Sequence, residues 1–513
     1  MADLPFGEST GKSAEELNNS APLDVHRWSE YGEVNDFVNQ IYEQHFSDSW
    51  TDLEKKHLKV VLLDLYVIWT VDPDRCIAIH LNNNRYRAKS RYNSLHISRK
   101  TIDVATKLHE VGLIHSKRGF YDRAGYSKTC RIWPTQELVE HFTKARFSVF
   151  DISSHAERES LILHDEQKKD VQYEDTSETR RMRKVLSDYN ELLSRTHIDC
   201  AHLDHPYVVR ADGKRTYIDQ QHKFIYRVFN NSSWEEGGRF YGGWWELVSE
   251  HRRGIRINGE RTIELDYRGL HVVFLYALKN INYYHELSSS DPYEVHIPET
   301  NDPKFARELA KRMMLSLVNA TDERKVFKAV QQKTNQLGDC PSHMTLTFKL
   351  LRKILAQLRL KHPQIEEYFL SGAGTEMQFL DSQMTELIVK HFTAKGIPVL
   401  TVHDSYVIQE RYRDELMDQM DIAWQEVTHL ESEDFQIVHG GYVAPDHLVD
   451  HDAVYEKPVT DTAIKQIGYV DELEGEDWEE HLRIESLKES EYVSQRYSDN
   501  LELFREWVER KTS

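Results

Sequence analysis

Residues 399–410, VLTVHDSYVIQE, place two ionisable side chains inside a run of apolar, mostly β-branched residues. Such a run is typical of strands buried in a sheet. Because His403 and Asp404 divide it, we expect two strands joined by a tight hairpin turn. Asp404 is then either an ordinary turn residue or a carboxylate that serves a site at the edge of the sheet. Ser-Tyr after Asp404 is poor turn chemistry, which favours the second interpretation, and His403 has the alternative of being a satisfied core histidine.

A second carboxylate follows a strand-like segment about 140 residues earlier in the chain. The stretch RTIELDYRGLHVVFLYALKN, residues 261–280, predicts a strand that ends at Asp266 and an apolar helix after it. One role for Asp266 is to cap that helix. The other is catalytic, because two aspartates on adjacent strands can hold two divalent cations roughly 4 Å apart. Oxygen ligands suit Mg²⁺ or Mn²⁺.

A third segment lies between the two aspartates. ARELAKRMMLSLVNA, residues 306–320, predicts a helix that carries Arg307, Lys311, Leu315 and Asn319 on one face, at intervals of four residues. Two cations one turn apart, followed by an apolar and a polar position, make a surface for a triphosphate and its base. Arg-x3-Lys pairs are common on solvated helices, so this pattern gains its value from its place between Asp266 and Asp404.

The three segments in this order resemble motifs A, B and C of the superfamily that contains family A DNA polymerases and phage-type single-subunit RNA polymerases. The resemblance covers roughly residues 225–410 and implies an α/β (α+β) right-hand core of palm, fingers and thumb. It implies catalysis by Asp266 and Asp404, with two Mg²⁺ or Mn²⁺ ions held by these carboxylates and the backbone carbonyl of Tyr267. It implies that Arg307 and Lys311 grip the incoming nucleoside triphosphate.

Further matches and departures concern the branch of the superfamily. His-Asp-Ser at 403–405, EEGGRFYGGWW at 235–245 and FLDSQMTEL at 379–387 resemble the RNA polymerase branch and imply that Arg239 and His403 face the template and primer. Tyr267 matches the DNA polymerases. His271 stands where they have Glu, Leu315 replaces an aromatic residue, and Asn319 stands where Tyr is usual. The resemblance places all three in the nucleotide pocket, and the bulk of His271 favours deoxynucleotides.

Residues 51–150 predict a winged helix-turn-helix domain. In ISRKTIDVATKLHEVGLIHSKRGF, residues 97–120, an apolar stripe predicts a recognition helix from Arg99, with Ser98 as its N-cap, followed by a basic hairpin and the return strand KTCRIWP. The domain has 18 basic and 10 acidic side chains, which favours nucleic acid over protein contacts. The residues expected to contact DNA are Arg99, Lys100, Lys117, Arg118 and Arg123.

The remaining segments are assigned from composition. Residues 1–50, with 10 acidic and 2 basic side chains, predict an acidic, partly disordered arm. Residues 151–224 predict a linker helix and thumb-like helices, 225–450 the palm and fingers, and 451–513 an acidic helical extension. No apolar stretch reaches the roughly 18 residues of a membrane span, and four separated cysteines form no CxxC pair, so we expect a soluble cytoplasmic protein that does not bind membranes.

Together these features predict a nucleotidyltransferase, a family A-like DNA polymerase that extends a 3′-hydroxyl on DNA (a primer-template or an origin) with nucleoside triphosphates. Such an enzyme would replicate a mobile element, plasmid or phage. A single-subunit RNA polymerase or primase is the alternative within the class. The alternative outside it is a non-catalytic, DNA-binding replication initiator or regulator whose palm survives as a scaffold.

Overall fold

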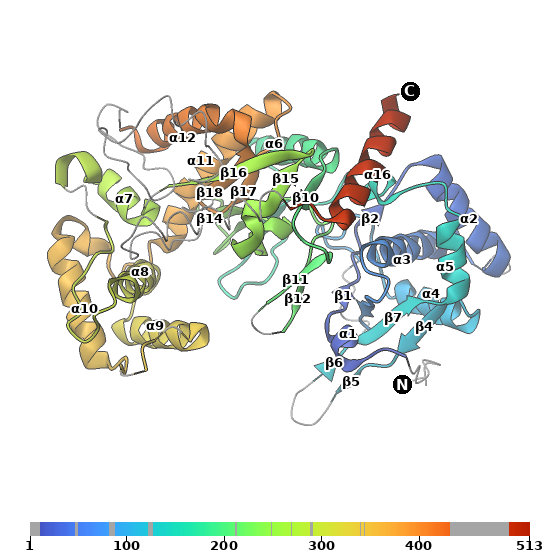
Figure 1. Cartoon of the computed structure of the whole chain (residues 1–513), viewed down its shortest axis with the longest axis horizontal. Helices are drawn as coiled ribbons and strands as arrows, with labels where there is room; N and C mark the ends of the chain where they lie inside the picture. Colours follow the sequence, from blue (N-terminus) through green and yellow to red (C-terminus); the bar gives the residue numbers. More distant parts are fainter. Residues whose placement is uncertain are drawn as a thin grey trace.

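The computed structural model describes residues 11–430 and 492–512, apart from gaps at 47–49, 82–87, 122–126, 211–212 and 288–290 and at residues 248, 268, 339 and 343. Over these residues the protein is a mixed α/β molecule, which confirms the predicted class. Three regions are visible in Figure 1: an N-terminal domain, a core built on a five-stranded sheet, and a helical lobe beyond that sheet.

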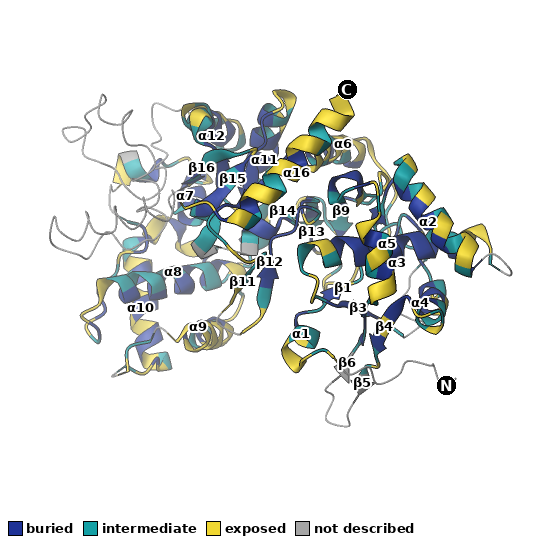
Figure 2. Ribbon diagram, turned by 45° about the vertical axis from the view of Figure 1, so that its right-hand side comes forward, coloured by how far each residue is buried: buried dark blue, intermediate teal, exposed yellow. Residues whose placement is uncertain are grey.

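The N-terminal domain packs helices against a four-stranded sheet of order β1-β3-β7-β4. The central helix α3 (Asp52–Val71) has buried side chains on all sides from His57 to Ile68 (Figure 2), because its apolar run leaves no polar face there. The other elements are β1 (Ala21–Pro22), β3 (Ile77–Ile79), α4 (Lys100–Glu110), β4 (Ile114–Lys117), β5 (Phe120–Tyr121), β6 (Ser127–Lys128), β7 (Cys130–Pro134) and α5 (Gln136–Thr143).

The prediction of an arm over residues 1–50 was wrong for most of the described part. Residues 11–46 contain α1 (Ala14–Asn18) and α2 (Gly32–His45), and β1 pairs in parallel with β3. Helix α2 buries Val34, Phe37, Val38 and Ile41 in the core of the N-terminal domain. The acidic side chains of α2 lie on its outer face, so composition alone hid an amphipathic helix. Residues 1–10 lie outside the described residues.

The segment before the predicted recognition helix also differs from expectation. Helix α4 begins at Lys100 with Arg99 at the N-cap, so Ser98 is not the cap, although the backbone N–H of Lys100 donates to its Oγ at 3.3 Å. Described residues 88–99 form turns and extended chain, where a helix-turn-helix would need a short helix. Side chains of Ser90, Asn93 and Ser98 form local hydrogen bonds to the backbone there, which compete with helix.

Residues 151–224 are mostly not helical, contrary to the prediction of a linker helix and thumb-like helices. Among the described residues there, the one α-helix is α6 (Ser177–Ser194). The other elements are η2 (Val149–Asp151), β8 (Ser153–Ser154), β9 (Leu161–Leu163), β10 (Ile198–Cys200), β11 (Tyr207–Val209) and β12 (Arg215–Tyr217). Strand β8 pairs with β2 (Arg27–Trp28) of the N-terminal domain, and β9 pairs with β13 of the core, so this segment joins the two regions through sheets.

The core sheet has the order β10-β15-β16-β18-β17, and its neighbouring strands are antiparallel. Helices α11 and α12 pack beside it, and α11 also covers the smaller sheet β14-β13-β9. The elements are β13 (Tyr226–Phe229), β14 (Gly237–Tyr241), β15 (Ile255–Ile257), β16 (Glu260–Asp266), α11 (Gly374–Ala394), β17 (Leu400–Val402), β18 (Ser405–Gln409) and α12 (Arg413–Thr428).

The helical lobe follows β16 in the chain and lies at the left of Figure 1. Helix α8 packs on both α9 and α10, and α11 of the core contacts α8. Its helices are α7 (Leu270–Ala277), α8 (Pro303–Asn319), α9 (Glu323–Leu337) and α10 (Phe348–Lys361). Among the described residues, no helix combines the length and apolar character that a membrane crossing requires.

Helix α16 (Gln495–Thr512) returns from the C-terminal segment and binds the core and the N-terminal domain together (Figure 1). At its start, Arg496 donates to both carboxylate oxygens of Asp199 on β10, at 3.0 and 2.7 Å. Near its end, the indole N–H of Trp507 donates to Asp151 at 2.9 Å and Lys511 pairs with the same carboxylate at 3.1 Å. The predicted C-terminal helix is confirmed for residues 495–512; residues 451–491 lie outside the described part.

Candidate active site

The hairpin predicted over residues 399–410 is confirmed, and it brings the two aspartates together. Strands β17 and β18 are joined by a two-residue turn of His403 and Asp404, in which His403 has a left-handed φ of 57°. Strand β16 ends at Asp266, which lies directly opposite Ser405, the first residue of β18. Asp404 precedes Ser405, so both carboxylates stand at the same end of adjacent strands, which in a sheet lie about 4.8 Å apart.

The ionised form of the Asp266 carboxyl is disfavoured in this position. Its side chain still reaches solvent, although protein surrounds it closely on the other sides. This burial raises the pKa of the Asp266 carboxyl well above its usual value, and the charge of Asp404 raises it further. Lys311 of α8 acts in the opposite direction and lowers the pKa. Two carboxylates and one ammonium group therefore share a common electrostatic field.

The alternative role of Asp266 as a helix cap is excluded by the geometry. The N-cap of α7 is Gly269, which has a left-handed φ of 65°. Glycine is needed there for its conformation and for space, because an added Cβ would lie 2.7 Å from Cγ of Pro292. The side chain of Asp266 is therefore not used to satisfy the backbone of α7.

The face of α8 predicted to carry Arg307 and Lys311 is partly accessible, while Leu309, Ala310 and Met313 are buried. Lys311 forms no ion pair with a described residue. Arg307 differs, because its guanidinium pairs with Asp291 at 2.8 Å and with Glu308 at 2.9 Å. Lys311 is thus available to a phosphate, whereas Arg307 would have to exchange the Asp291 carboxylate for one.

Leu315 and Asn319 continue along α8 away from Lys311. The side-chain amide of Asn319 donates to the carbonyl of Leu315 at 2.7 Å and packs on Gly374, where an added Cβ would lie 1.9 Å from Oδ1 of Asn319. At 1.5 Å per residue, Asn319 is about 12 Å along the helix from Lys311. Its described contacts thus join α8 to the start of α11 and include none with His271.

A buried chain of polar groups that sequence reasoning missed connects α11 to α7. Nε of Arg239 donates to Asp381 at 2.6 Å, and its Nη2 donates to Nε2 of His271 at 3.1 Å. Burial raises the pKa of Asp381 to about 7 and lowers that of His271 to about 4. His271 is therefore neutral at physiological pH. Asp381 lies on α11 within FLDSQMTEL, the segment that resembles the RNA polymerase branch, but that resemblance does not assign a role to this residue.

His403 and Tyr267 lie on opposite sides of the sheet's end. His403 is exposed, and its ring meets the edge of Tyr241 with centroids 5.8 Å apart. Tyr267 is buried and its hydroxyl donates to the carbonyl of Met420 at 2.7 Å, so the ring anchors the sheet to α12. Only the backbone of Tyr267 is thus left to serve the site.

Glu264, two residues before Asp266 on the same face of β16, is a further carboxylate that sequence reasoning missed. Its oxygens accept from Nε and Nη2 of Arg252 at 2.9 and 2.8 Å, and one of them accepts from Ser405 Oγ at 2.7 Å. Glu264 therefore ties Arg252 and Ser405 to β16, although its charge still contributes to the raised pKa of Asp266.

The residues fit a hard divalent cation. Burial and the neighbouring charge of Asp404 raise the pKa of Asp266, and a cation between the two carboxylates would relieve their repulsion. Among the described residues, no group of three or more His, Cys, Asp or Glu side chains comes together as a metal site. Two carboxylates with water and substrate phosphate oxygens nevertheless match the way Mg²⁺ is commonly held.

The residues predicted to contact DNA in the N-terminal domain differ in how accessible their charged groups are. Arg99 and Arg118 are exposed, and Lys117 is half-buried. Lys100 pairs with Glu54 of α3 at 2.7 Å, so it is less suited to a phosphate contact than predicted. Arg123 lies outside the described residues.

Replacement of Arg99 and Arg118 by Gln should weaken binding of duplex DNA to the full chain. If each arginine neutralises one phosphate, the slope of log affinity against log salt should become shallower by about 0.9 per residue. Fluorescence anisotropy over a salt series measures this slope. Lys144→Gln, at the end of α5, is the control. An unchanged slope would assign this face to protein contacts.

Comparison with known proteins adds one similarity. No protein-family model matches the chain. An alignment of 101 positions, which covers 18% of the chain, shows 33% identity to a riboflavin kinase from Methanosphaera stadtmanae and covers 75% of that protein. Most of the chain lies outside this similarity.

Proposed function

We propose that this chain is a template-directed nucleotidyltransferase, a DNA polymerase that extends a 3′-hydroxyl. The observation that carries the proposal is the placement of Asp266 and Asp404 at the ends of adjacent strands, with Lys311 of α8 in their electrostatic field. This is the arrangement that nucleotidyl transfer requires: carboxylates at the reacting oxygens and a cation at the triphosphate.

Each residue of the candidate active site has a part in this reaction. Asp266 and Asp404 would hold two Mg²⁺ or Mn²⁺ ions, which when bound lower the pKa of the 3′-hydroxyl and neutralise charge on the pyrophosphate. Lys311 binds the triphosphate, and Arg307 joins it by releasing Asp291. His271 is neutral and accepts a hydrogen bond from Arg239. It lies in the first turn of α7, where its ring contacts the sugar of the nucleotide.

The architecture proposed around this site is a palm made by the core sheet, fingers made by α7 to α10, and a winged helix before them. The sheet order β3-β7-β4, with α4 directly before β4 and a hairpin between β4 and β7, supports the winged helix. The basic face at Arg99 and Arg118 then docks on duplex DNA, at an origin or a primer-template junction.

The test is primer extension by the purified full chain on a primed DNA template, with labelled dNTPs and Mg²⁺ or Mn²⁺. The expected result is stepwise extension that EDTA abolishes. Synthesis from rNTPs on unprimed template would favour the RNA polymerase or primase alternative. Origin binding without metal-dependent synthesis under any of these conditions would favour the non-catalytic initiator.

We propose a second candidate activity on the basis of the similarity to a riboflavin kinase. If the aligned residues retain the reaction that this name describes, the chain would transfer a phosphoryl group from a nucleoside triphosphate to riboflavin. Adding riboflavin to the same preparation, and separating the products by chromatography, distinguishes the two reactions. Phosphorylation of riboflavin by the Asp404→Asn variant would show that the kinase activity is independent of the carboxylate pair.

The sugar preference should depend on His271. Because its ring is bulky and neutral, it blocks a ribose 2′-hydroxyl by a clash that costs more than a hydrogen bond gains. We expect the wild type to prefer dNTPs with modest discrimination and His271→Ala to raise the use of rNTPs relative to dNTPs. The ratio of kcat/KM for the two substrates measures this effect. His391→Ala, whose histidine pairs with Glu415 on the surface of the core, is the control. A selective loss of rNTP use in His271→Ala would refute the steric role.

A further inference from the structure

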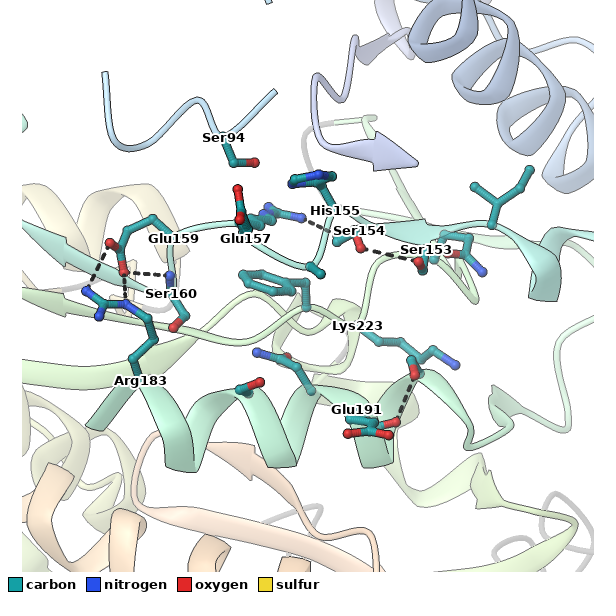
Figure 3. A pocket seen from close by; sticks show the side chains of 18 of the residues that line it. Ser94, Ser153, Ser154, His155, Glu157, Glu159, Ser160, Arg183, Glu191 and Lys223 are labelled. Carbon is teal, nitrogen blue, oxygen red and sulfur yellow. Dashed lines mark hydrogen bonds and ion pairs between the residues drawn. The ribbon is translucent and has the colours of Figure 1, made fainter. Parts of the chain in front are cut away.

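A cavity of about 980 Å³ lies between the N-terminal domain and the core, and neither Asp266 nor Asp404 lines it. Figure 3 shows α6 along one wall, with Arg183 and Glu191, and the segment from Ser153 to Ser160 along the other. Loop 220–224 of the core and Trp507 of α16 complete it. Its volume is near the upper end of the range of about 300–1,000 Å³ that is usual for ligand sites.

One side of the cavity is a rigid, neutral framework. Arg183 pairs with Glu159 at 3.1 Å and with Asp175 at 2.9 Å, and Arg91 of the N-terminal domain pairs with the same two carboxylates at 2.8 and 2.9 Å. Two guanidinium groups and two carboxylates cancel in charge. These four residues therefore hold the walls together without giving the cavity a net charge.

Three further cations line the cavity and form no ion pair with a described residue: Arg158, Arg180 and Lys223. Lys223 is only 5% exposed, and its ammonium donates to the carbonyl of Thr196 at 2.7 Å, which uses one of its three N–H groups. Arg158 lies over the ring of Phe224, with its guanidinium carbon 4.1 Å from the centroid. Burial lowers the pKa of Lys223 to about 7 against the opposing charge of Asp219, so an anion in the cavity would favour its charged form.

Aromatic side chains lie between this cavity and the carboxylate pair. Phe224 lines the cavity, and two residues later Tyr226 begins β13. The ring of Tyr226 lies 6.4 Å from that of Tyr241 on β14, which in turn lies 5.8 Å from the ring of His403. All four rings remain partly or fully accessible, and Asp404 is the next residue after His403.

We propose that single-stranded nucleic acid occupies this cavity and follows the rings to the site. Arg158, Arg180 and Lys223 neutralise its phosphates, and its bases stack on Phe224, Tyr226, Tyr241 and His403. Cations interleaved with accessible rings are the means by which proteins hold single strands regardless of sequence. The inference rests on the proposed polymerase function and names a path for the strand between the N-terminal domain and the core.

The first experiment measures binding of a fluorescein-labelled oligothymidylate to the full chain, without metal or nucleotide. Arg180→Gln should make the slope of log affinity against log salt shallower by about 0.7, the value for one phosphate contact on a single strand. Phe224→Leu should lower affinity roughly tenfold, through the loss of one stacked base. Lys144→Gln is the charge-matched control. Retention of wild-type affinity and slope by both variants would overturn the proposal.

A second experiment locates the strand without changing a residue that binds it. In a Cys340→Ser background, the thiol introduced by Ser153→Cys lies on the exposed edge of the cavity. Saturating oligothymidylate should slow its reaction with a bulky maleimide at least several-fold and should leave a Thr143→Cys control unaffected. Equal rates with and without oligonucleotide would place the strand elsewhere. Because neither assay needs catalysis, an inactive but protected protein would refute the polymerase proposal alone.

Discussion

Asp404→Asn and Asp266→Asn should each lower the rate of nucleotide incorporation by about 10³-fold or more. Both carboxylates stand at the ends of adjacent strands, and an amide oxygen carries no charge with which to hold a divalent cation. Loss of one preorganised electrostatic partner commonly costs 10²–10³-fold in rate, and here a metal would be lost with it. Single-turnover primer extension with saturating Mg²⁺ measures the effect on chemistry alone.

The same variants should fold as well as the wild type. Because Asp404 raises the pKa of Asp266, the ionised pair is mutually repulsive, and replacing one member should leave the midpoint of thermal unfolding unchanged or raise it. Asp414→Asn, in the first turn of α12, is the matched control for both assays. If either variant incorporates nucleotides at nearly the wild-type rate, the proposal that the core sheet is a polymerase palm is wrong.

Lys311→Ala should raise the KM for the nucleoside triphosphate by about 10- to 100-fold, while the affinity for primer-template stays within a factor of two. A hydrogen bond to a charged group contributes about 1.5–3 kcal/mol, which corresponds to this range. Steady-state kinetics with varied dNTP gives the first quantity, and anisotropy with labelled primer-template gives the second.

Arg307→Ala is the informative comparison for Lys311→Ala. Its guanidinium already pairs with Asp291, so any gain on contacting phosphate is reduced by the loss of that ion pair, and we expect a smaller effect on KM. An equal loss of nucleotide and DNA affinity in Lys311→Ala would instead assign this lysine to the phosphate backbone of the nucleic acid.

Local patterns were sufficient to predict the elements that carry the site. The β-branched runs around Asp404, the strand before Asp266 and the amphipathic helix of Lys311 each contain their own periodicity, and all three form as expected. Register then follows from burial, because a shift by one residue would turn Leu265 and Ile263 outward. The pairing of β16 with β18 is therefore a consequence of two short alternating patterns.

Contacts between distant segments could not be predicted in this way. Asp381 lies on a helix of mixed polar and apolar residues and gives no local sign that it accepts a hydrogen bond from Arg239, 142 residues earlier in the chain. Arg307 and Lys100 matched expected binding patterns, but Asp291 and Glu54 neutralise them through tertiary packing. The strands of residues 151–224 were missed because each has only two or three residues, too few to show a period.

The long reach of α16 has a consequence for the order in which the protein folds during synthesis. The hydrogen bond from Trp507 to Asp151 joins residues 356 positions apart, and the bond from Arg496 to Asp199 joins residues 297 positions apart. Both bonds can form only after α16 has been synthesised. Until then, two carboxylates that are almost fully covered in the finished protein remain without these partners. The N-terminal domain and the core, which the pairs β8–β2 and β9–β13 already join, therefore lack these α16 contacts until the last part of the chain is made. Because these contacts close long loops, we expect docking of α16 to be a late step in folding.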